Sequence, residues 1–381
     1  MPSSLSIRKG TSQSRDAGQA ARELFAALDQ PDIKFAVFYC ASDFDLPTLA
    51  TEMHRCFGDI NLVGCTSAGE ITPQGYLQGA LTGFSIASAD MDAVTLAIPL
   101  DPFDSASAGQ SVADLLGRLG TRDGLPANAT DTFAFMLIDG LSMQEEMAVS
   151  CVHQHLQGIE LVGGSAADDV RFQSTHLYCD GRFHRNVALL SLVRTSLPFL
   201  TFRTQHFVKS DTRMVVTRAD PVSRIVHEIN GKPAAREFAR LVGMQIAELT
   251  PLIFATHPVV VRIGGQYFVR SIAKVNDDDS LTFFCAIDEG LVFTVARPQD
   301  ILSSTESKLR EIDKELGGIE MVLGFDCVLR RLDAETRQIR HQIEDIYRRY
   351  HVVGFHTYGE QFNAMHLNQT LTGIAFGTRP S

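Results

Sequence analysis

The sequence predicts an α/β protein with mixed sheets, in two domains built from pseudo-repeated strand–helix–strand units and β-hairpins. The first observation is a stretch that occurs three times: Val-Gly-Cys-Thr-Ser-Ala-Gly-Glu at 63–70, Val-Gly-Gly-Ser-Ala-Ala-Asp-Asp at 162–169 and Val-Gly-Phe-His-Thr-Tyr-Gly-Glu at 353–360. The second is that each copy, here called a Val-Gly signature, follows an apolar run and an amphipathic helix, over the roughly 30 residues that such a unit needs. The third is pairs of hairpin-like apolar runs, which make the sheets mixed.

The first half of the chain contains two of these units. Continuous apolar runs predict buried strands, and apolar residues at helical spacing predict helices. In chain order we expect a helix at 16–28, a strand at 33–40, a helix at 46–57, strands at 61–65, 81–87 and 93–100, a helix at 105–119, a strand at 132–138, a helix at 143–157, and strands at 160–163, 175–179, 188–193, 199–209 and 214–218.

The pattern changes near residue 220, where we place a domain boundary. The predicted limits are an N-terminal segment and helix at 1–31, a first domain at 32–215 and a second at 222–381. The second domain is expected to contain a strand at 223–229, a helix at 234–242, strands at 259–263, 267–273, 281–286 and 290–296, a helix at 300–316, a strand at 321–329, a helix at 333–350, and strands at 352–355 and 370–376.

Composition and charge narrow the functional classes. The net charge of −11 argues against a nucleic-acid partner, which would call for a basic face. No apolar run reaches the roughly 18 residues of a membrane helix, so no membrane association is expected. The first 20 residues lack the apolar segment of a secretory signal, and we expect a frayed start. The seven cysteines show no paired metal-ligand spacing, and buried free thiols indicate a cytoplasmic protein.

The signatures are the candidate ligand site. Ligands of open sheets bind at the carboxyl ends of the strands, where these hydroxyl and carboxylate groups would gather. For a single copy, tight turns with packing glycines are the preferred interpretation, whereas three copies that each end in an acid make a ligand site at least an equal one. The candidate ligand-binding residues are Thr66, Ser67, Glu70, Ser165, Asp169 and Glu360.

The chain carries little that predicts an enzyme. The glycine spacing from Gly64 to Gly69 resembles a phosphate-binding loop, but Glu70 stands where such a loop has lysine. Cys65 has no identifiable base beside it. His153 and His155 lie two positions apart on a predicted helix and point to different faces. We therefore expect no enzymatic activity.

Three histidines surround the third signature: His351, His356 and His366. His356 occupies the position held by Thr66 and Ser165 in the other copies. One histidine beside an apolar pocket is enough for the axial ligand of a b-type haem. Hydrogen-bonded structural histidines are the other interpretation, because histidine has many roles.

At these motifs the sequence resembles the FIST sensory-domain family, in the order N-terminal and then C-terminal FIST domain. The resemblance covers residue 32 to the end and implies cytoplasmic sensing of a small ligand, coupled to a histidine kinase or a cyclic-di-GMP enzyme. The segments that carry it are Leu-Val-Gly-Cys-Thr-Ser-Ala-Gly-Glu-Ile at 62–71, Val-Gly-Gly-Ser-Ala at 162–166, Asn-Gly-Lys-Pro-Ala at 230–234, Cys-Val-Leu-Arg at 327–330 and Gly-Phe-His-Thr-Tyr-Gly-Glu at 354–360.

Tyr-Gly-Glu-Gln at 358–361 and His-Leu-Asn-Gln-Thr at 366–370 resemble the haem-binding, nitric-oxide-sensing branch of that family. The resemblance implies a haem b cofactor, with His366 as the first choice for the iron ligand and His356 as the second. Tyr358, Phe355 and Met365 are the further candidates for cofactor contact. A FIST-type sensor that binds a small solute such as an amino acid, without haem, is the alternative, and a homo-oligomer is left open.

Overall fold

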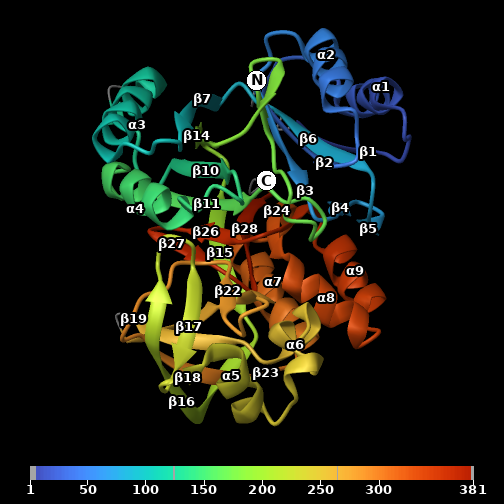
Figure 1. Ribbon diagram of the computed structural model, residues 1–381. Helices are drawn as coiled ribbons and strands as arrows, with labels where there is room; N and C mark the ends of the chain where they lie inside the picture. The colour runs from blue at the N-terminus through green and yellow to red at the C-terminus, as the bar shows by residue number, and fades with distance from the viewer. Residues whose placement is uncertain (1–5, 123–124, 264, 379–381) are drawn as a thin grey trace.

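The computed structural model describes residues 6–122, 125–263 and 265–378. Within these residues the chain forms three six-stranded sheets and one eight-stranded sheet, with helices on their outer faces (Figure 1). Both parallel and antiparallel pairs occur in each six-stranded sheet, for example β2 with β3 and β2 with β6. The predicted α/β class with mixed sheets is confirmed.

The three six-stranded sheets share one strand order: an edge strand, a return strand, the two parallel strands of a strand–helix–strand unit, and a hairpin from a different unit. The first unit consists of β1 (Ser6–Ser12), α1 (Ala17–Leu28), β2 (Ile33–Ala41), α2 (Leu46–Phe57), β3 (Leu62–Ser67), the hairpin β4 (Glu70–Thr72) and β5 (Gly75–Leu77), and the return strand β6 (Leu81–Ala87).

The second unit repeats this order and adds a small two-stranded sheet, β8 and β9, after its first helix. It consists of β7 (Met91–Pro99), α3 (Ser105–Leu119), β8 (Thr121–Arg122), β9 (Leu125–Pro126), β10 (Thr132–Ile138), α4 (Glu145–His155), β11 (Glu160–Ser165), the hairpin β12 (Leu177–Cys179) and β13 (Arg182–His184), and the return strand β14 (Val187–Thr195).

The third unit is interrupted after its edge strand. It consists of β15 (Phe199–Gln205) and then, after an insertion, α7 (Ile301–Leu316), β24 (Ile319–Cys327), α8 (Val328–Thr336), α9 (Arg340–Arg349), β25 (Val352–Thr357), the hairpin β26 (Glu360–Phe362) and β27 (Met365–Leu367), and the return strand β28 (Thr370–Gly377).

The units exchange their hairpins in a closed cycle. The hairpin of the first unit pairs with β25 of the third, that of the third with β11 of the second, and that of the second with β3 of the first. Two of the hairpins begin at the last residue of a signature, Glu70 and Glu360, and the third begins at Leu177, shortly after the second signature ends, so this exchange brings the three signatures together.

The insertion between β15 and α7 forms the eight-stranded sheet with short helices on it (yellow and orange in the lower half of Figure 1). The chain leaves and returns at one point, where the Gln299 N–H donates to the His206 carbonyl (2.6 Å). Its elements are β16 (Phe207–Asp220), β17 (Ile225–Ile229), β18 (Lys232–Pro233), α5 (Ala234–Val242), the 3₁₀ turn Ile246–Glu248, α6 (Pro251–Thr256), β19 (Val259–Ile263), β20 (Gln266–Arg270), β21 (Ile272–Val275), β22 (Leu281–Phe283) and β23 (Val292–Pro298).

The inner faces of the three six-stranded sheets pack on one another in a shared apolar core. Tyr39 of the first sheet stacks on Phe355 of the third, with ring centroids 4.5 Å apart. Phe135 of the second sheet contacts Phe325 of the third at 5.7 Å. The helices close the outer faces, for example α1 and α2 over the first sheet. Among the described residues, none of the helices has the length and apolar character of a membrane span.

Several local predictions differ from the structure. Residues 6–12, expected to be frayed, form β1, because they pair along the full length of β6. The strand expected at 321–329 ends at Cys327, and the helix expected at 333–350 is two helices, α8 and α9. The expected domain boundary at 215–222 falls near the end of β16, inside the insertion; those domain limits remain a prediction.

Candidate functional site

The three Val-Gly signatures lie at the carboxyl ends of β3, β11 and β25 and join in a ring of main-chain hydrogen bonds. The ring forms because each signature leaves the sheet of its own unit and continues into a hairpin that pairs with a strand of another sheet. Its three equivalent N–H to carbonyl bonds run from Ala68 to His356 (2.9 Å), from Ala167 to Thr66 (3.0 Å) and from Tyr358 to Ser165 (3.3 Å).

Glu70 and Glu360 occupy equivalent positions, and both carboxyl groups are fully buried. Glu70 accepts hydrogen bonds from the Ser67 hydroxyl (2.5 Å) and the Ala80 N–H (3.0 Å). Glu360 accepts from the Thr357 hydroxyl, the Thr370 N–H (3.1 Å) and the Thr370 hydroxyl (2.7 Å). Each acid therefore fastens its own signature to the start of its return strand.

Burial dominates the ionisation of these two acids. It raises the pKa of Glu70 to about 7, against the lowering effect of its hydrogen bonds and of Arg331. It raises the pKa of Glu360 to about 8, against the hydrogen bonds from Thr357 and Thr370. A buried carboxyl group favours its neutral form because charge is poorly solvated there.

In the second signature the buried acid is Asp168, one residue before the candidate Asp169. Asp168 organises the following loop, residues 168–174, here called the strap. Its carboxylate also accepts the hydrogen bond of the Tyr358 hydroxyl. Three strap N–H groups donate to it, those of Phe172 (2.9 Å), Gln173 (2.7 Å) and Ser174 (2.9 Å).

Asp169 reaches outward and pairs with Arg331 of α8, with Nη2 and Oδ1 3.2 Å apart. Ser67, Glu70 and Asp169 line one cavity of about 20 Å³. The structure thus brings together candidate residues of the first and second signatures, around a space the size of a water molecule. Thr66 and Ser165 lie on the ring itself, where the Thr66 hydroxyl accepts from the His176 N–H (3.1 Å).

His356 is fully buried on the face of β25 opposite to Phe355, as strand alternation requires. Its ring lies edge-on to Tyr76 (4.4 Å between centroids), and Nδ1 is 3.9 Å from the Asp326 carboxylate. Neither ring nitrogen has a hydrogen-bond partner among the described residues. Burial, and then Arg331, hold the pKa of His356 well below its usual value.

His366 lies on β27, opposite Gln361 of β26. Its Nδ1 is 3.2 Å from the Gln361 amide nitrogen, which also donates to the Ser165 hydroxyl (2.9 Å). Nε2 has no hydrogen-bond partner in the described part of the chain, although the Phe284 backbone lies beside the ring. Burial lowers the pKa of His366 to about 4, while Glu146 acts in the opposite direction.

The five candidate cofactor residues do not converge on one pocket. Phe355 belongs to the shared core, and Tyr358 packs on Phe172 of the strap, with centroids 4.9 Å apart. Met365 packs on the inserted sheet. His356 and His366 face different neighbours, the first Tyr76 and the second Gln361. In the described residues, no group of three or more His, Cys, Asp or Glu side chains is placed to hold a metal ion.

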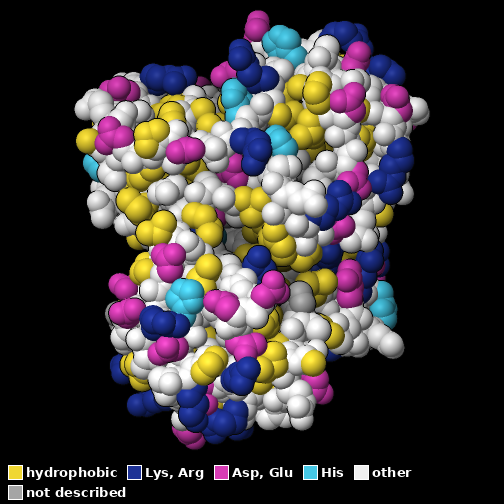
Figure 2. Space-filling model, viewed as in Figure 1, with side chains coloured by type: hydrophobic (Ala, Val, Ile, Leu, Met, Phe, Trp, Pro, Cys, Tyr) yellow, Lys and Arg dark blue, Asp and Glu magenta, His cyan; other side chains and the backbone are white. Residues whose placement is uncertain are grey.

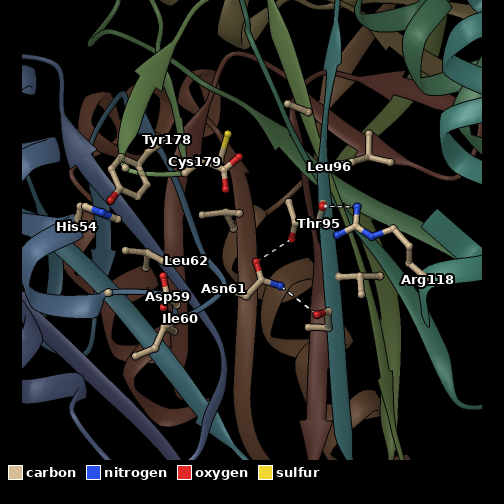
Figure 3. Close-up of a pocket in the computed structure, with 17 residues that line it drawn as sticks. His54, Asp59, Ile60, Asn61, Leu62, Thr95, Leu96, Arg118, Tyr178 and Cys179 are labelled. Carbon is tan, nitrogen blue, oxygen red and sulfur yellow. Dashed lines mark hydrogen bonds between the residues drawn. The ribbon is translucent and has the colours of Figure 1, made fainter. Parts of the chain in front are cut away.

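A larger cavity of about 460 Å³ lies at the other end of β3, beside the edge strand β7 (Figure 3). Asn61 and Arg118 point at the free edge of β7 and donate to the Ala93 (3.2 Å) and Thr95 (3.4 Å) carbonyls. Because these carbonyls are already bonded, and the signatures lie at the opposite strand end, this cavity is not the candidate site.

Figure 2 shows acidic and basic side chains interspersed over the visible face of the molecule.

Sequence reasoning missed Asp168, Arg331 and Gln361. Asp168 is adjacent in the sequence to the predicted Asp169. The two acids differ in burial, which depends on the strap and is not visible in the sequence. The sequence signal for Arg331 is two adjacent arginines inside Val-Leu-Arg-Arg-Leu at 328–332, a charged pair in an apolar segment. Gln361 lies directly across the hairpin from His366 and contacts its Nδ1.

Comparison with protein-family models matches residues 34–232 to the FIST N domain and residues 234–363 to the FIST C domain. A search of curated proteins found no match to the chain. FIST domains are sensory modules that bind small ligands in signalling proteins, which agrees with a site built from buried polar groups. The two matches together cover most of the sequence, and the chain therefore belongs to the FIST family.

Proposed function

We propose that this protein is a haem-dependent sensor of nitric oxide or another diatomic gas, with His366 as the protein ligand of haem b. The observation that carries the proposal is the buried imidazole of His366, whose Nε2 makes no hydrogen bond of regular geometry within the described residues and has only the Phe284 backbone beside it. A buried ring nitrogen without a partner is unusual, because buried polar groups are nearly always hydrogen-bonded. Haem iron supplies a binding site for diatomic gases once a histidine holds it.

Two features of the His366 ring bear on this role: its protonation state and its contact with Gln361. Its pKa of about 4 keeps it neutral near pH 7, and only a neutral imidazole ligates iron. Iron ligation by Nε2 requires the ring proton on Nδ1, so the Gln361 amide, whose nitrogen lies 3.2 Å from Nδ1, has to turn its oxygen toward the ring to accept that hydrogen bond; such an outer contact fixes the ring orientation of a ligating histidine. The same amide bonds Ser165, so a movement of His366 is passed to the second signature.

Nε2 of His366 is the ring atom that would ligate the iron, but the space around the ring is narrow. A Cβ added at Gly359 would lie 2.2 Å from His366 Cε1, so only glycine allows this ring position. None of the described cavities is lined by His366 or His356. A cofactor pocket needs several hundred Å³, so loading requires the hairpin β26–β27 to separate from α4 and the inserted sheet.

The visible absorption spectrum tests the proposal. Protein expressed with ample haem supply should show a Soret band that shifts with nitric oxide. His366→Ala should abolish or strongly shift this band, whereas His356→Ala should perturb it less. Retention of the wild-type spectrum in His366→Ala, or no band in the haem-supplied wild type, would contradict the proposal.

The alternative, a small solute such as an amino acid held by the signature residues, has less support. Glu70 and Glu360 already receive hydrogen bonds from their own hydroxyl and backbone neighbours, so they offer a solute few free positions. A cytoplasmic histidine kinase or a cyclic-di-GMP enzyme is the partner that we propose. Autophosphorylation of such a kinase should respond to nitric oxide only when haem-loaded protein is present.

A further inference from the structure

Arg331 is a buried cation whose bonding is incomplete. It is 4% exposed, and its Nη2 donates to Asp169 Oδ1 (3.2 Å). Nε and Nη1 have no hydrogen-bond partner among the described residues. Nε lies 3.8 Å from the Glu335 carboxylate, beyond hydrogen-bond distance. Within the described residues, one of the three guanidinium nitrogen atoms of Arg331 therefore makes a hydrogen bond.

The neighbouring Arg330 shows what a completed buried arginine looks like in this fold. Its Nε pairs with Asp326 (2.5 Å), Nη1 lies 2.9 Å from the His206 ring nitrogen, and Nη2 donates to Thr305 (3.0 Å). Two arginines adjacent in the sequence thus differ in one respect: Arg330 is satisfied by the protein, and Arg331 is not. Buried donors without acceptors are destabilising and call for a partner.

The partner that Arg331 does have is weakly held. The Asp169 side chain is 40% exposed. Asp169, Val170 and Phe172 all have positive φ angles (55°, 65° and 55°), which a β-branched residue such as Val170 rarely adopts. The strap is kept in this conformation by Asp168 and by the exposed ion pair of Arg171 with Asp43.

The residues around Arg331 determine which class of ligand can bind there. Arginine binds a planar carboxylate through two parallel N–H groups, and the Nε–Nη2 edge of Arg331 has only the Nη2 bond filled. Asp43, Glu70 and Asp169 line the adjacent cavity, so a ligand with two negative charges would be repelled. A small monocarboxylate suits this edge better than a phosphate dianion.

We propose that Arg331 binds a small carboxylate in place of Asp169, and that this exchange releases the strap. Asp169 acts as a stand-in that closes the site while no ligand is bound. The released strap withdraws Phe172 from Tyr358 in the third signature and so passes the binding event to the ring of signatures. This site does not involve His366 and holds whether or not the protein binds haem.

Acetate is the probe for this site, and chloride at equal ionic strength is the control for screening. Binding to the full-length protein is measured by titration calorimetry. Hydrogen exchange of the Phe172, Gln173 and Ser174 amides, which donate to Asp168, reports the strap. We expect acetate to accelerate exchange at these three amides, and chloride to leave it unchanged.

Two substitutions test the roles of Asp169 and Arg331 separately. Asp169→Asn keeps a residue that tolerates positive φ but removes the competing charge, so acetate should bind about tenfold more tightly. Arg331→Lys retains the charge without the bidentate edge and should weaken acetate binding by about tenfold or more. Arg337→Lys, directly after the end of the same helix and paired with Asp333 at 2.8 Å, is the matched control and should bind as wild type.

The outcomes decide the proposal and keep it apart from the haem proposal. His366→Ala should lose the haem spectrum and still bind acetate like the wild type. Equal acetate affinity in wild type, Asp169→Asn and Arg331→Lys would overturn the carboxylate site. So would binding that leaves exchange of the three strap amides unchanged, or the absence of acetate binding to the folded Asp169→Asn protein.

Discussion

The Tyr358 hydroxyl donates a hydrogen bond to the buried carboxylate of Asp168, a residue 190 positions earlier in the chain. This bond joins the third signature to the strap that follows the second. The Tyr358 ring also stacks on Phe172 of the strap, at an interplanar angle of 24°. The two contacts make Tyr358 the point at which the strap is attached to the ring of signatures.

Tyr358→Phe should therefore destabilise the protein by about 1.5–3 kcal/mol, the contribution of a hydrogen bond to a charged group. The ring stack remains, so the fold is kept while the strap loosens. Urea unfolding measures the change. Tyr39→Phe is the matched control: the buried Tyr39 hydroxyl has no partner among the described residues, so its removal should be neutral or stabilising. Equal effects of the two substitutions would contradict the assigned role of Asp168.

The buried acid Glu360 should make stability fall as the pH rises. Its pKa is about 8 in the folded protein against an ordinary value of 4.5. Between these values the folded state holds a proton that the unfolded state has released, so raising the pH favours unfolding. The contribution is greatest below about pH 4.5 and is lost as the pH passes through about 8. Glu70 acts in the same direction up to its pKa of about 7.

Glu360→Gln, which remains neutral, should flatten this dependence. Relative to wild type, the variant should gain at least about 1 kcal/mol between pH 5 and pH 9, the equivalent of roughly one pKa unit. Urea unfolding at the two pH values measures it. Glu311→Gln, at an exposed position in α7, is the control and should change nothing. A parallel pH profile for Glu360→Gln and wild type would refute the raised pKa.

The signature glycines are required by sheet packing. A Cβ at Gly163 would lie 1.9 Å from the Met136 carbonyl oxygen of the paired strand β10. Gly163→Ala should therefore destabilise the protein by about 3 kcal/mol or more. Gly117, inside α3, has no atom within 4 Å of its added Cβ, so Gly117→Ala should stabilise by about 0.5–1 kcal/mol. Thermal melts compare the two, and a mild effect at Gly163 would contradict the packing argument.

The parts of the fold that the sequence predicted are those that local patterns determine. The strands that carry the signatures are continuous apolar runs, and the helices between them show a clear apolar face. The hairpins β4–β5 and β26–β27 were not predicted, because their strands are three residues long and are stabilised by pairing with distant strands. The exchange of hairpins between units depends on contacts more than one hundred residues apart in the sequence, such as Leu177 with Cys65, which no local pattern encodes.

The candidate site was predicted in its location but not in its connections. Strand ends and signature acids followed from spacing, and Glu70, Glu360 and Asp169 lie where the signatures end. Which acid is buried depends on the strap, and the importance of Arg331 depends on its missing acceptors. His356 and His366 were grouped because they are close in sequence. The alternation of β25 and the hairpin β26–β27 turn them toward different neighbours.

The last prediction concerns the insertion between β15 and α7. Its ends meet at the Gln299 to His206 hydrogen bond (2.6 Å), and Phe207 pairs with Pro298, so residues 207–298 can be excised and replaced by a two-residue turn. The three six-stranded sheets share a core without the inserted strands, and we expect the excised protein to unfold cooperatively in urea. It should be less stable than the full chain, because Leu367 loses its apolar contacts with the inserted sheet. Deleting only 207–242 removes β16 and β17, the central strands of the inserted sheet, and leaves β23 and β22 each with an unpaired edge, so this variant should instead aggregate. An excised protein without a cooperative transition would mean that the three sheets depend on the insertion to fold.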